Sequence, residues 1–193
     1  MRLVCFGDSN TRGYDPRSYL GSLYGSENRW VDILGAKTGF QVLNWGENGR
    51  EVPKAAVSFP EDTQLLIVML GTCNLLQGMG VEETARRMER FISGLSLERE
   101  KLLLIAPPPI VPGQWVQDAE LIRASRELAA AYGELAERLG IFFADAGLWD
   151  VSMAYDGVHF TEQGHRAFAR GLLKVLDELS PAFAAPCPRS PGV

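Results

Sequence analysis

Short runs of apolar residues alternate along the chain with longer segments whose apolar residues recur at helical spacing. The run at residues 65–70 is apolar on both faces, as is typical of a central strand in a parallel sheet. The segment at residues 81–95 carries apolar residues on one face and Glu and Arg on the other, which predicts an amphipathic helix. Predicted strands cover residues 3–6, 40–45, 65–70, 101–106 and 141–144, and predicted helices cover 29–37, 81–95, 117–139 and 161–179.

The ends of these segments carry local signals that support the same boundaries. Asn28 is a predicted N-cap and Gly39 a predicted stop of the first helix, and Thr161 is the predicted N-cap of the last. Residues 51–58 are expected to form a further short helix, because Pro53 would be tolerated in its first turn.

Alternation of strands and helices through the whole chain predicts a parallel sheet with helices on both faces, a three-layer α/β/α sandwich. Five strands suit the flavodoxin-like order 2-1-3-4-5. A length of 193 residues favours one domain, which we place at residues 1–180. The Pro/Ala-rich segment at 181–193 is expected to be a loose tail.

Composition narrows the function classes. A net charge of −5 argues against a nucleic-acid partner, because nucleic-acid-binding proteins usually carry a basic stripe. Three cysteines without regular spacing do not form a disulfide framework, and only two histidines, none at zinc spacing, make a metal site unexpected. The sequence shows no secretory signal and no apolar run long enough to span a membrane, so we expect a cytoplasmic protein.

Three polar, glycine-containing loops follow the first three predicted strands. They are Gly7-Asp8-Ser9, residues 46–50 and residues 71–74. The carboxyl ends of parallel strands meet at one edge of the sheet, and these strands are neighbours in the predicted order, so we expect the loops to lie close together. The loop with Asp156 and His159 follows the fifth strand and can return to the same edge.

These loops would supply the groups needed for acyl transfer. A serine attacks the carbonyl, a histidine takes its proton, and an aspartate orients the histidine. Gly-Asp-Ser alone is also an ordinary turn, since all three residues are common turn formers. Of the two histidines, His165 falls inside a predicted helix and is expected to be structural, whereas His159 lies in a loop three residues after Asp156.

The segment directly after Ser9, residues 11–28, is rich in Gly, Tyr, Ser and Asn and predicts a long loop. Its aromatic residues either line a pocket beside Ser9 or pin the loop to the surface. These residues are Tyr14, Tyr19, Tyr24 and, just beyond, Trp30.

Taken together, the motifs resemble those of the GDSL, or SGNH, hydrolases. The resemblance rests on Gly7-Asp8-Ser9, the glycine loop after strand 2, the Gly-Thr pair at residues 71–72 and Asp-x-x-His at residues 156–159. Residues 5–9 and 156–161 are particularly similar to the intracellular arylesterase and acyltransferase branch. Each motif alone is weak, but four in family order span nearly the whole chain.

The resemblance implies roles for individual residues. Ser9 would be the nucleophile and its backbone amide one oxyanion donor, with Gly49, or less favourably Gly46, giving the second amide. His159 would be the base and Asp156 its orienting partner. Asp8, Asn10 and Thr72 would contact the substrate, and no cofactor is required.

The third motif departs from the family pattern Gly-Thr-Asn-Asp, because Cys73 stands where the oxyanion-hole asparagine belongs and Asn74 follows it. Three interpretations remain open: Asn74 supplies the amide, the Cys73 thiol serves as a weak donor, or the hole is broken. A nucleophilic Cys73 is disfavoured, since no base is predicted beside it.

The leading hypothesis is a serine esterase that acts on small-molecule esters, with acyl transfer to alcohols as an implied second activity. The alternative is a catalytically impaired protein of the same fold that binds a small ligand. A nucleotide or flavin binder is disfavoured, because no Gly-x-Gly-x-x-Gly or Walker loop follows a strand. The resemblance also leaves a homo-oligomer open.

Overall fold

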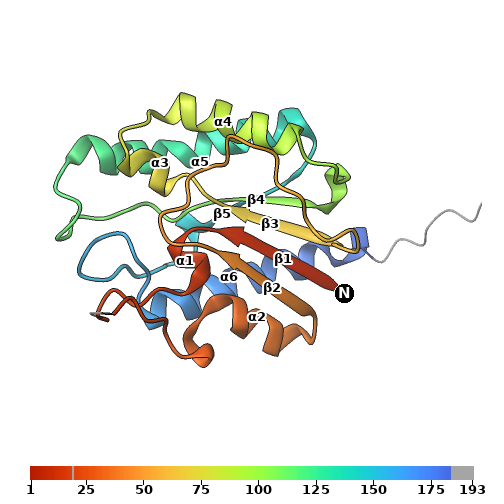
Figure 1. Cartoon of the computed structure of the whole chain (residues 1–193), viewed down its shortest axis with the longest axis horizontal. Coiled ribbons are helices and arrows are strands. Elements are labelled where there is room, and N and C mark those ends of the chain that lie inside the picture. The colour runs from red at the N-terminus through yellow and green to blue at the C-terminus, as the bar shows by residue number, and fades with distance from the viewer. Residues whose placement is uncertain (19, 184–193) are drawn as a thin grey trace, which may run out of the picture.

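The computed structural model describes residues 1–18 and 20–183 and contains a five-stranded, all-parallel sheet in the order β2-β1-β3-β4-β5 (Figure 1). The predicted flavodoxin-like topology is confirmed. Strand bounds are β1 Arg2–Gly7, β2 Gln41–Gly46, β3 Leu65–Met69, β4 Leu102–Ala106 and β5 Phe142–Asp145.

Helices cover both faces of the sheet, as the alternation of elements predicts. In Figure 1, α2 and α6 lie on one side of the strands and α3, α4 and α5 on the other. Their bounds are α1 Ser9–Arg12, α2 Trp30–Thr38, α3 Thr72–Leu76, α4 Val81–Ser93, α5 Ala119–Leu139 and α6 Glu162–Phe183. Short 3-10 helices cover Ser26–Asn28, Arg99–Lys101 and Ala146–Leu148.

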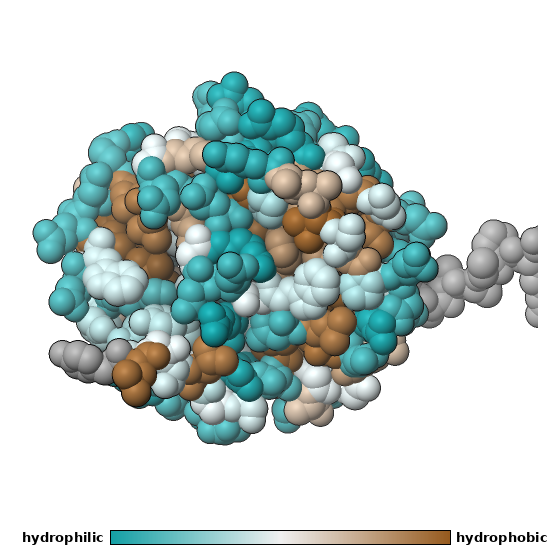
Figure 2. Space-filling view, in the orientation of Figure 1, coloured by the Kyte–Doolittle hydropathy of each residue, from teal (hydrophilic) through white to brown (hydrophobic). Residues whose placement is uncertain are grey.

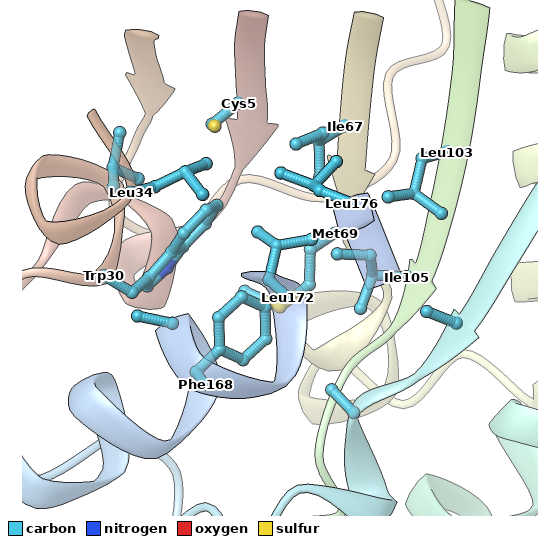
Figure 3. Close-up of a cluster of buried hydrophobic side chains, with 14 of the residues drawn as sticks. Cys5, Trp30, Leu34, Ile67, Met69, Leu103, Ile105, Phe168, Leu172 and Leu176 are labelled. Atoms are coloured by element: carbon cyan, nitrogen blue, oxygen red, sulfur yellow. The ribbon is translucent and has the colours of Figure 1, made fainter. Parts of the chain in front are cut away.

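The core between the sheet and the α2/α6 layer explains why the central strands are apolar on both faces. Trp30 of α2 and Phe168 of α6 are almost fully buried, with ring centroids 4.8 Å apart. Figure 3 shows them facing Cys5, Ile67 and neighbouring strand residues. A second buried cluster fills the opposite face under α4 and α5. Burial on both faces fixes which loops emerge together at the strand ends.

Strand register brings the predicted loops to one edge. Gly7, the last residue of β1, lies opposite Gly46 of β2 and Met69 of β3. All three strands therefore end at the same level. Gly46 has a packing reason to be glycine, because a Cβ there would lie 2.1 Å from the backbone nitrogen of Arg12.

Two local expectations are wrong. Residues 51–58 form no helix but an irregular segment with a bend at residues 54–55; the backbone N–H of Val52 donates to the Asn74 side chain at 2.9 Å, and Val52 is fully buried. Asn28 does not cap α2, because its amide bonds Glu27 and Arg166 instead, and α2 has no side-chain cap. The short helices α1 and α3, both directly after strands, were not predicted.

The last helix, α6, begins as predicted but ends later than predicted. Thr161 caps α6 as predicted, since its hydroxyl accepts the N–H of Gly164 at 2.9 Å. The helix continues to Phe183, past its predicted end. Residues 184–193 of the expected tail lie outside the described residues. Over the part of the chain that the structure describes, no helix is both long and apolar enough to cross a membrane.

His165 is fully buried on α6, in keeping with the structural role expected for it. Its ring lies 5.3 Å, centroid to centroid, from the rings of Tyr24 and Phe160. Neither ring nitrogen has a hydrogen-bond partner within residues 1–18 and 20–183. Burial, aided by the charges of His159 and Arg29, lowers the pKa of His165 to about 3, so its ring is neutral in the folded protein near neutral pH.

We expect His165→Phe to make stability less sensitive to acid. Between about pH 6.5 and 3 the unfolded chain binds a proton on His165 that the folded protein does not, so this residue lowers the free energy of unfolding as the pH falls. The slope is at most about 1.4 kcal/mol per pH unit. Asp8 acts in the opposite direction between about pH 4 and 6, because burial raises its pKa to about 6.

The measurement is therefore the difference in unfolding free energy between variant and wild type, from urea titrations at pH 7 and pH 5. Phe168→Leu, which removes buried ring volume from the same helix without a titratable group, is the matched control. A His165→Phe difference that stays constant with pH would contradict the assignment.

Candidate active site

Ser9 is held where β1 gives way to a short helix. It is the first residue of α1, and the carboxylate of Asp8 caps this helix by accepting the backbone N–H of Asn10 at 2.9 Å. Gly13, with φ +89°, ends the helix four residues later. The backbone N–H of Ser9 has no acceptor among the described residues. The turn thus presents both the hydroxyl and the N–H of Ser9 at the sheet edge.

Asp156 and His159 come from the loop between β5 and α6. One carboxylate oxygen of Asp156, Oδ1, accepts the backbone N–H groups of Val158 and His159, each at 2.9 Å. Gly157, which directly follows Asp156, has a φ of +83°, a conformation that is strained for a residue with a side chain. The three-residue spacing therefore closes a tight turn that fixes the carboxylate beside the imidazole.

The three side chains form one continuous chain of contacts. Ser9 Oγ lies 3.0 Å from Nε2 of His159, and Nδ1 of His159 lies 2.7 Å from Oδ2 of Asp156. Burial acts to raise the pKa of Asp156, but hydrogen bonds from the His159 ring and from two backbone N–H groups outweigh it and lower this pKa. An ionised carboxylate only accepts, so Nδ1 carries the proton and Nε2 is left to accept from Ser9.

Asp156 is fully buried, and Ser9 and His159 line a cavity of about 290 Å³ at the carboxyl edge of the sheet. Tyr14 and Trp115 form its aromatic walls, with ring centroids 4.7 Å and 5.3 Å from that of His159. No lysine or arginine among the described residues lines it. Figure 2 shows apolar groups within a mainly hydrophilic surface on the side toward which the strands of Figure 1 point.

The loop after β2 brings a backbone N–H to the same cavity. Residues 47–50 form a turn closed by the N–H of Arg50 on the carbonyl of Glu47, at 3.2 Å. Gly49, with φ +73°, lies in this turn and lines the cavity. Its N–H has no acceptor among the described residues. Gly46, the less favoured choice, does not line the cavity.

The structure does not place Asn74 of the third motif where the first interpretation expects it. Cys73 lines the cavity, whereas Asn74 is fully buried away from it. The Asn74 amide oxygen accepts from Val52, and its nitrogen donates to Glu51 at 3.1 Å. The expectation that Asn74 donates to the oxyanion is therefore wrong, because its side chain already connects the loop after β2 to α3.

Cys73 keeps its proton in this position. Burial, followed by the charges of Asp8 and Glu51, raises the pKa of its thiol to about 12. A thiol that stays protonated is a weak hydrogen-bond donor and a poor nucleophile. Its chemistry fits the second interpretation, a weak donor, and disfavours a nucleophilic role.

Two of the three residues expected to contact the substrate line the cavity, and the third does not. Asp8 and Thr72 line the cavity. Asn10 does not, because its amide donates to the carbonyl of Val158 and accepts the N–H of Phe160, at 3.1 and 2.9 Å. The expectation that Asn10 contacts the substrate is therefore wrong: its side chain anchors the loop that carries His159.

Of the aromatic residues after Ser9, one lines the cavity and two are buried in the core. Tyr14 lines the cavity, while Tyr24 and Trp30 are buried and pin the segment to the core, as their bonds to Phe160 and Asn10 carbonyls show. Tyr19 lies outside the described residues.

Trp115, like Leu76 and Gln77, lines the cavity but was not among the residues expected there from the sequence. It lies in the proline-containing segment after β4, which is strapped to the loop of Asp156 by backbone bonds from Gln114 to Tyr155 and from Trp115 to Asp156, at 2.9 and 3.1 Å. A Cβ on Gly113 would lie 2.4 Å from the backbone nitrogen of Gly157, so the two segments pack backbone to backbone. The position of this segment after a carboxyl strand end was the available signal.

A model of the GDSL-like lipase/acylhydrolase family matches residues 5–167. The chain belongs to this family. Its members include the enzyme class expected from the motifs, and the chain is a carboxylic ester hydrolase. No protein among those with curated functions matches it.

Solved structures resemble this GDSL-like hydrolase over most of its length. A protein from Agrobacterium tumefaciens str. C58 assigned as an arylesterase is 28% identical, with a TM-score of 0.78 over 92% of this chain and 99% of that chain. A carbohydrate acetylesterase family member from Sinorhizobium meliloti is 24% identical, with a TM-score of 0.77 over 92% and 98%. The aryl esterase of M. smegmatis is 23% identical, with a TM-score of 0.78 over 92% and 99%. The last two establish the shared fold.

Within residues 1–18 and 20–183, no group of three or more His, Cys, Asp or Glu side chains is arranged to hold a metal ion.

Proposed function

We propose that this chain is a serine esterase that hydrolyses small carboxylic esters through an acyl-enzyme on Ser9. The observation that carries the proposal is the unbroken contact chain from Ser9 Oγ through the His159 ring to Asp156, at 3.0 and 2.7 Å. All three residues are more than nine-tenths buried, and Ser9 and His159 line the cavity, so water competes weakly for their hydrogen bonds.

In the first half-reaction, Ser9 Oγ bonds to the carbonyl carbon of the ester while its proton passes to Nε2 of His159. The tetrahedral intermediate then releases the alcohol, which takes the proton from His159 and leaves the acyl group on Ser9. Asp156 accepts from Nδ1 throughout and stabilises the imidazolium. Water, or a second alcohol, repeats these steps in reverse and frees Ser9.

Three donors are available for the developing oxyanion. The N–H groups of Ser9 and Gly49 are free of other acceptors among the described residues, and the thiol of Cys73 lies in the same cavity. Two amides and a weak thiol give less stabilisation than two amides and a carboxamide, since pre-arranged donors are a major source of rate acceleration.

The cavity favours small, neutral esters. Its volume of about 290 Å³, its two aromatic walls and its lack of a lysine or arginine among the described residues offer nothing to pair with an anionic substrate. The arylesterase and carbohydrate acetylesterase assignments of the similar structures name esters compatible with such a cavity.

The test is active-site labelling with a neutral fluorophosphonate. One equivalent should attach to the peptide that contains Ser9, located by mass spectrometry, and block hydrolysis of p-nitrophenyl acetate in proportion. His159→Gln should slow labelling strongly while leaving the fold intact. Label on another residue, or full labelling without loss of hydrolysis, would refute the proposal; tight ester binding without labelling or turnover would favour an impaired binding protein.

A further inference from the structure

Arg50 connects the ends of the two strands that deliver Ser9 and Gly49. Its Nη1 donates to the carbonyl of Gly7 at 3.1 Å and also to the carbonyl of Trp45, and its Nη2 pairs with Glu47. The carbonyl of Gly7 accepts a second bond, from the N–H of Glu47, at 3.1 Å. One side chain therefore joins the last residue of β1 to the loop that follows β2.

The guanidinium group of Arg50 is held in place on its other side. Its central carbon lies 4.4 Å from the centroid of the Phe6 ring, which is a favourable cation–π distance. Phe6 is 3% exposed and packs against Phe59 and Phe91, with centroids at 5.2 and 5.6 Å. The guanidinium of Arg50 is thus held by the buried Phe6 ring on one face, in addition to its bonds to Gly7, Trp45 and the exposed Glu47.

These contacts lie within two residues of both proposed oxyanion amides. Gly7 precedes Ser9 by two residues, and Arg50 directly follows Gly49. The turn of Gly49 is closed by the N–H of Arg50 itself. Movement of the Arg50 side chain would therefore change the separation and direction of the Ser9 and Gly49 N–H groups.

We propose that Arg50 is a positioning residue that sets the geometry between these two N–H groups. The inference rests on the proposed function, because it gives those groups an oxyanion to bind. Arg50 does not line the cavity, so it contacts no substrate. Its loss should weaken transition-state binding and leave ground-state binding nearly unchanged.

The experiment compares Arg50→Met and Arg50→Lys with Arg2→Met. Arg2 is a matched control at the opposite edge of the sheet: it also connects β1 and β2, by a bond from its Nε to Gln41 at 3.0 Å, and it pairs with Asp62. The side chains of Arg2 and Arg50 are similarly exposed, at 28% and 20%. Hydrolysis of p-nitrophenyl acetate gives kcat and KM for each variant.

We expect Arg50→Met to lower kcat about tenfold or more with KM within about twofold, since small misplacements of catalytic groups cost up to about 100-fold. Arg50→Lys should recover part of kcat, because an ammonium keeps the charge but cannot bridge both carbonyls in the same fork. Arg2→Met should leave both constants unchanged.

Equal kcat in Arg50→Met and Arg2→Met would overturn the inference, as would a higher KM at unchanged kcat. If Arg50→Met does not fold, Arg50→Lys decides alone: a kcat equal to that of the wild type overturns the inference, and a reduced kcat at constant KM supports it. Failure of the proposed function is separate, because Ser9→Ala would then retain hydrolysis whatever the Arg50 variants do.

Discussion

Replacing Ser9 by alanine is expected to lower kcat for p-nitrophenyl acetate by about a millionfold. Removal of the nucleophile in a well-studied serine hydrolase has an effect of that size, because the histidine and aspartate have no reaction to assist without it. Here Nε2 of His159 lies 3.0 Å from Ser9 Oγ, in position to take the proton of that hydroxyl.

The side-by-side control is Ser22→Ala, an exposed serine in the segment that follows α1. It should keep wild-type kcat. Ser9→Ala should also keep the wild-type unfolding midpoint, because only one oxygen is removed from a cavity wall. Equal activity in wild type and Ser9→Ala would refute a role for Ser9 as nucleophile, whereas no activity in either would direct the search to esters of a different kind.

Replacing Cys73 by asparagine is expected to raise kcat by about 10- to 100-fold. Loss of a single oxyanion donor lowers kcat by about 100- to 1,000-fold in a well-studied hydrolase, and a thiol recovers only part of that contribution. Cys73 already faces the cavity, so an asparagine there directs its amide toward Ser9, where Asn74 cannot reach because it is bonded to Glu51 and Val52.

Two further variants separate donor strength from shape. Cys73→Ser should raise kcat less than asparagine, since a hydroxyl is a better donor than a thiol but shorter than a carboxamide. Cys73→Ala should lower kcat modestly, with KM nearly constant. If neither asparagine nor alanine changes kcat, residue 73 does not contribute to oxyanion binding.

Topology was predictable because the central strands β1, β3 and β4 are buried on both faces and therefore read as continuous apolar runs. β3 has five consecutive residues at most 1% exposed. Once the strand order was inferred, the three carboxyl-edge loops followed. The helix expected at residues 51–58 failed for a tertiary reason, namely the bond between the Val52 N–H and the Asn74 side chain, which no local pattern contains.

For the candidate site, spacing along the chain predicted which loops meet but not where each side chain points. Asp156 and His159 are three residues apart, so their contact is local. By contrast, the orientations of Cys73 and Asn74 depend on Glu51, which lies 23 residues before Asn74. Trp115 enters the cavity because its segment is bonded to the Asp156 loop, 41 residues further along the chain.

The backbone contact between Gly113 and Gly157 also limits how this enzyme can be altered by evolution or by design. The segment that carries Trp115 and the loop that carries Asp156 approach too closely for a side chain at either glycine, since added Cβ atoms would lie 2.4 and 2.2 Å from backbone atoms of the other segment. An exchange of the Trp115 segment that puts a side chain at residue 113 would therefore displace the Asp156 loop. The two segments pack as one unit, so a graft meant to change substrate preference has to carry both.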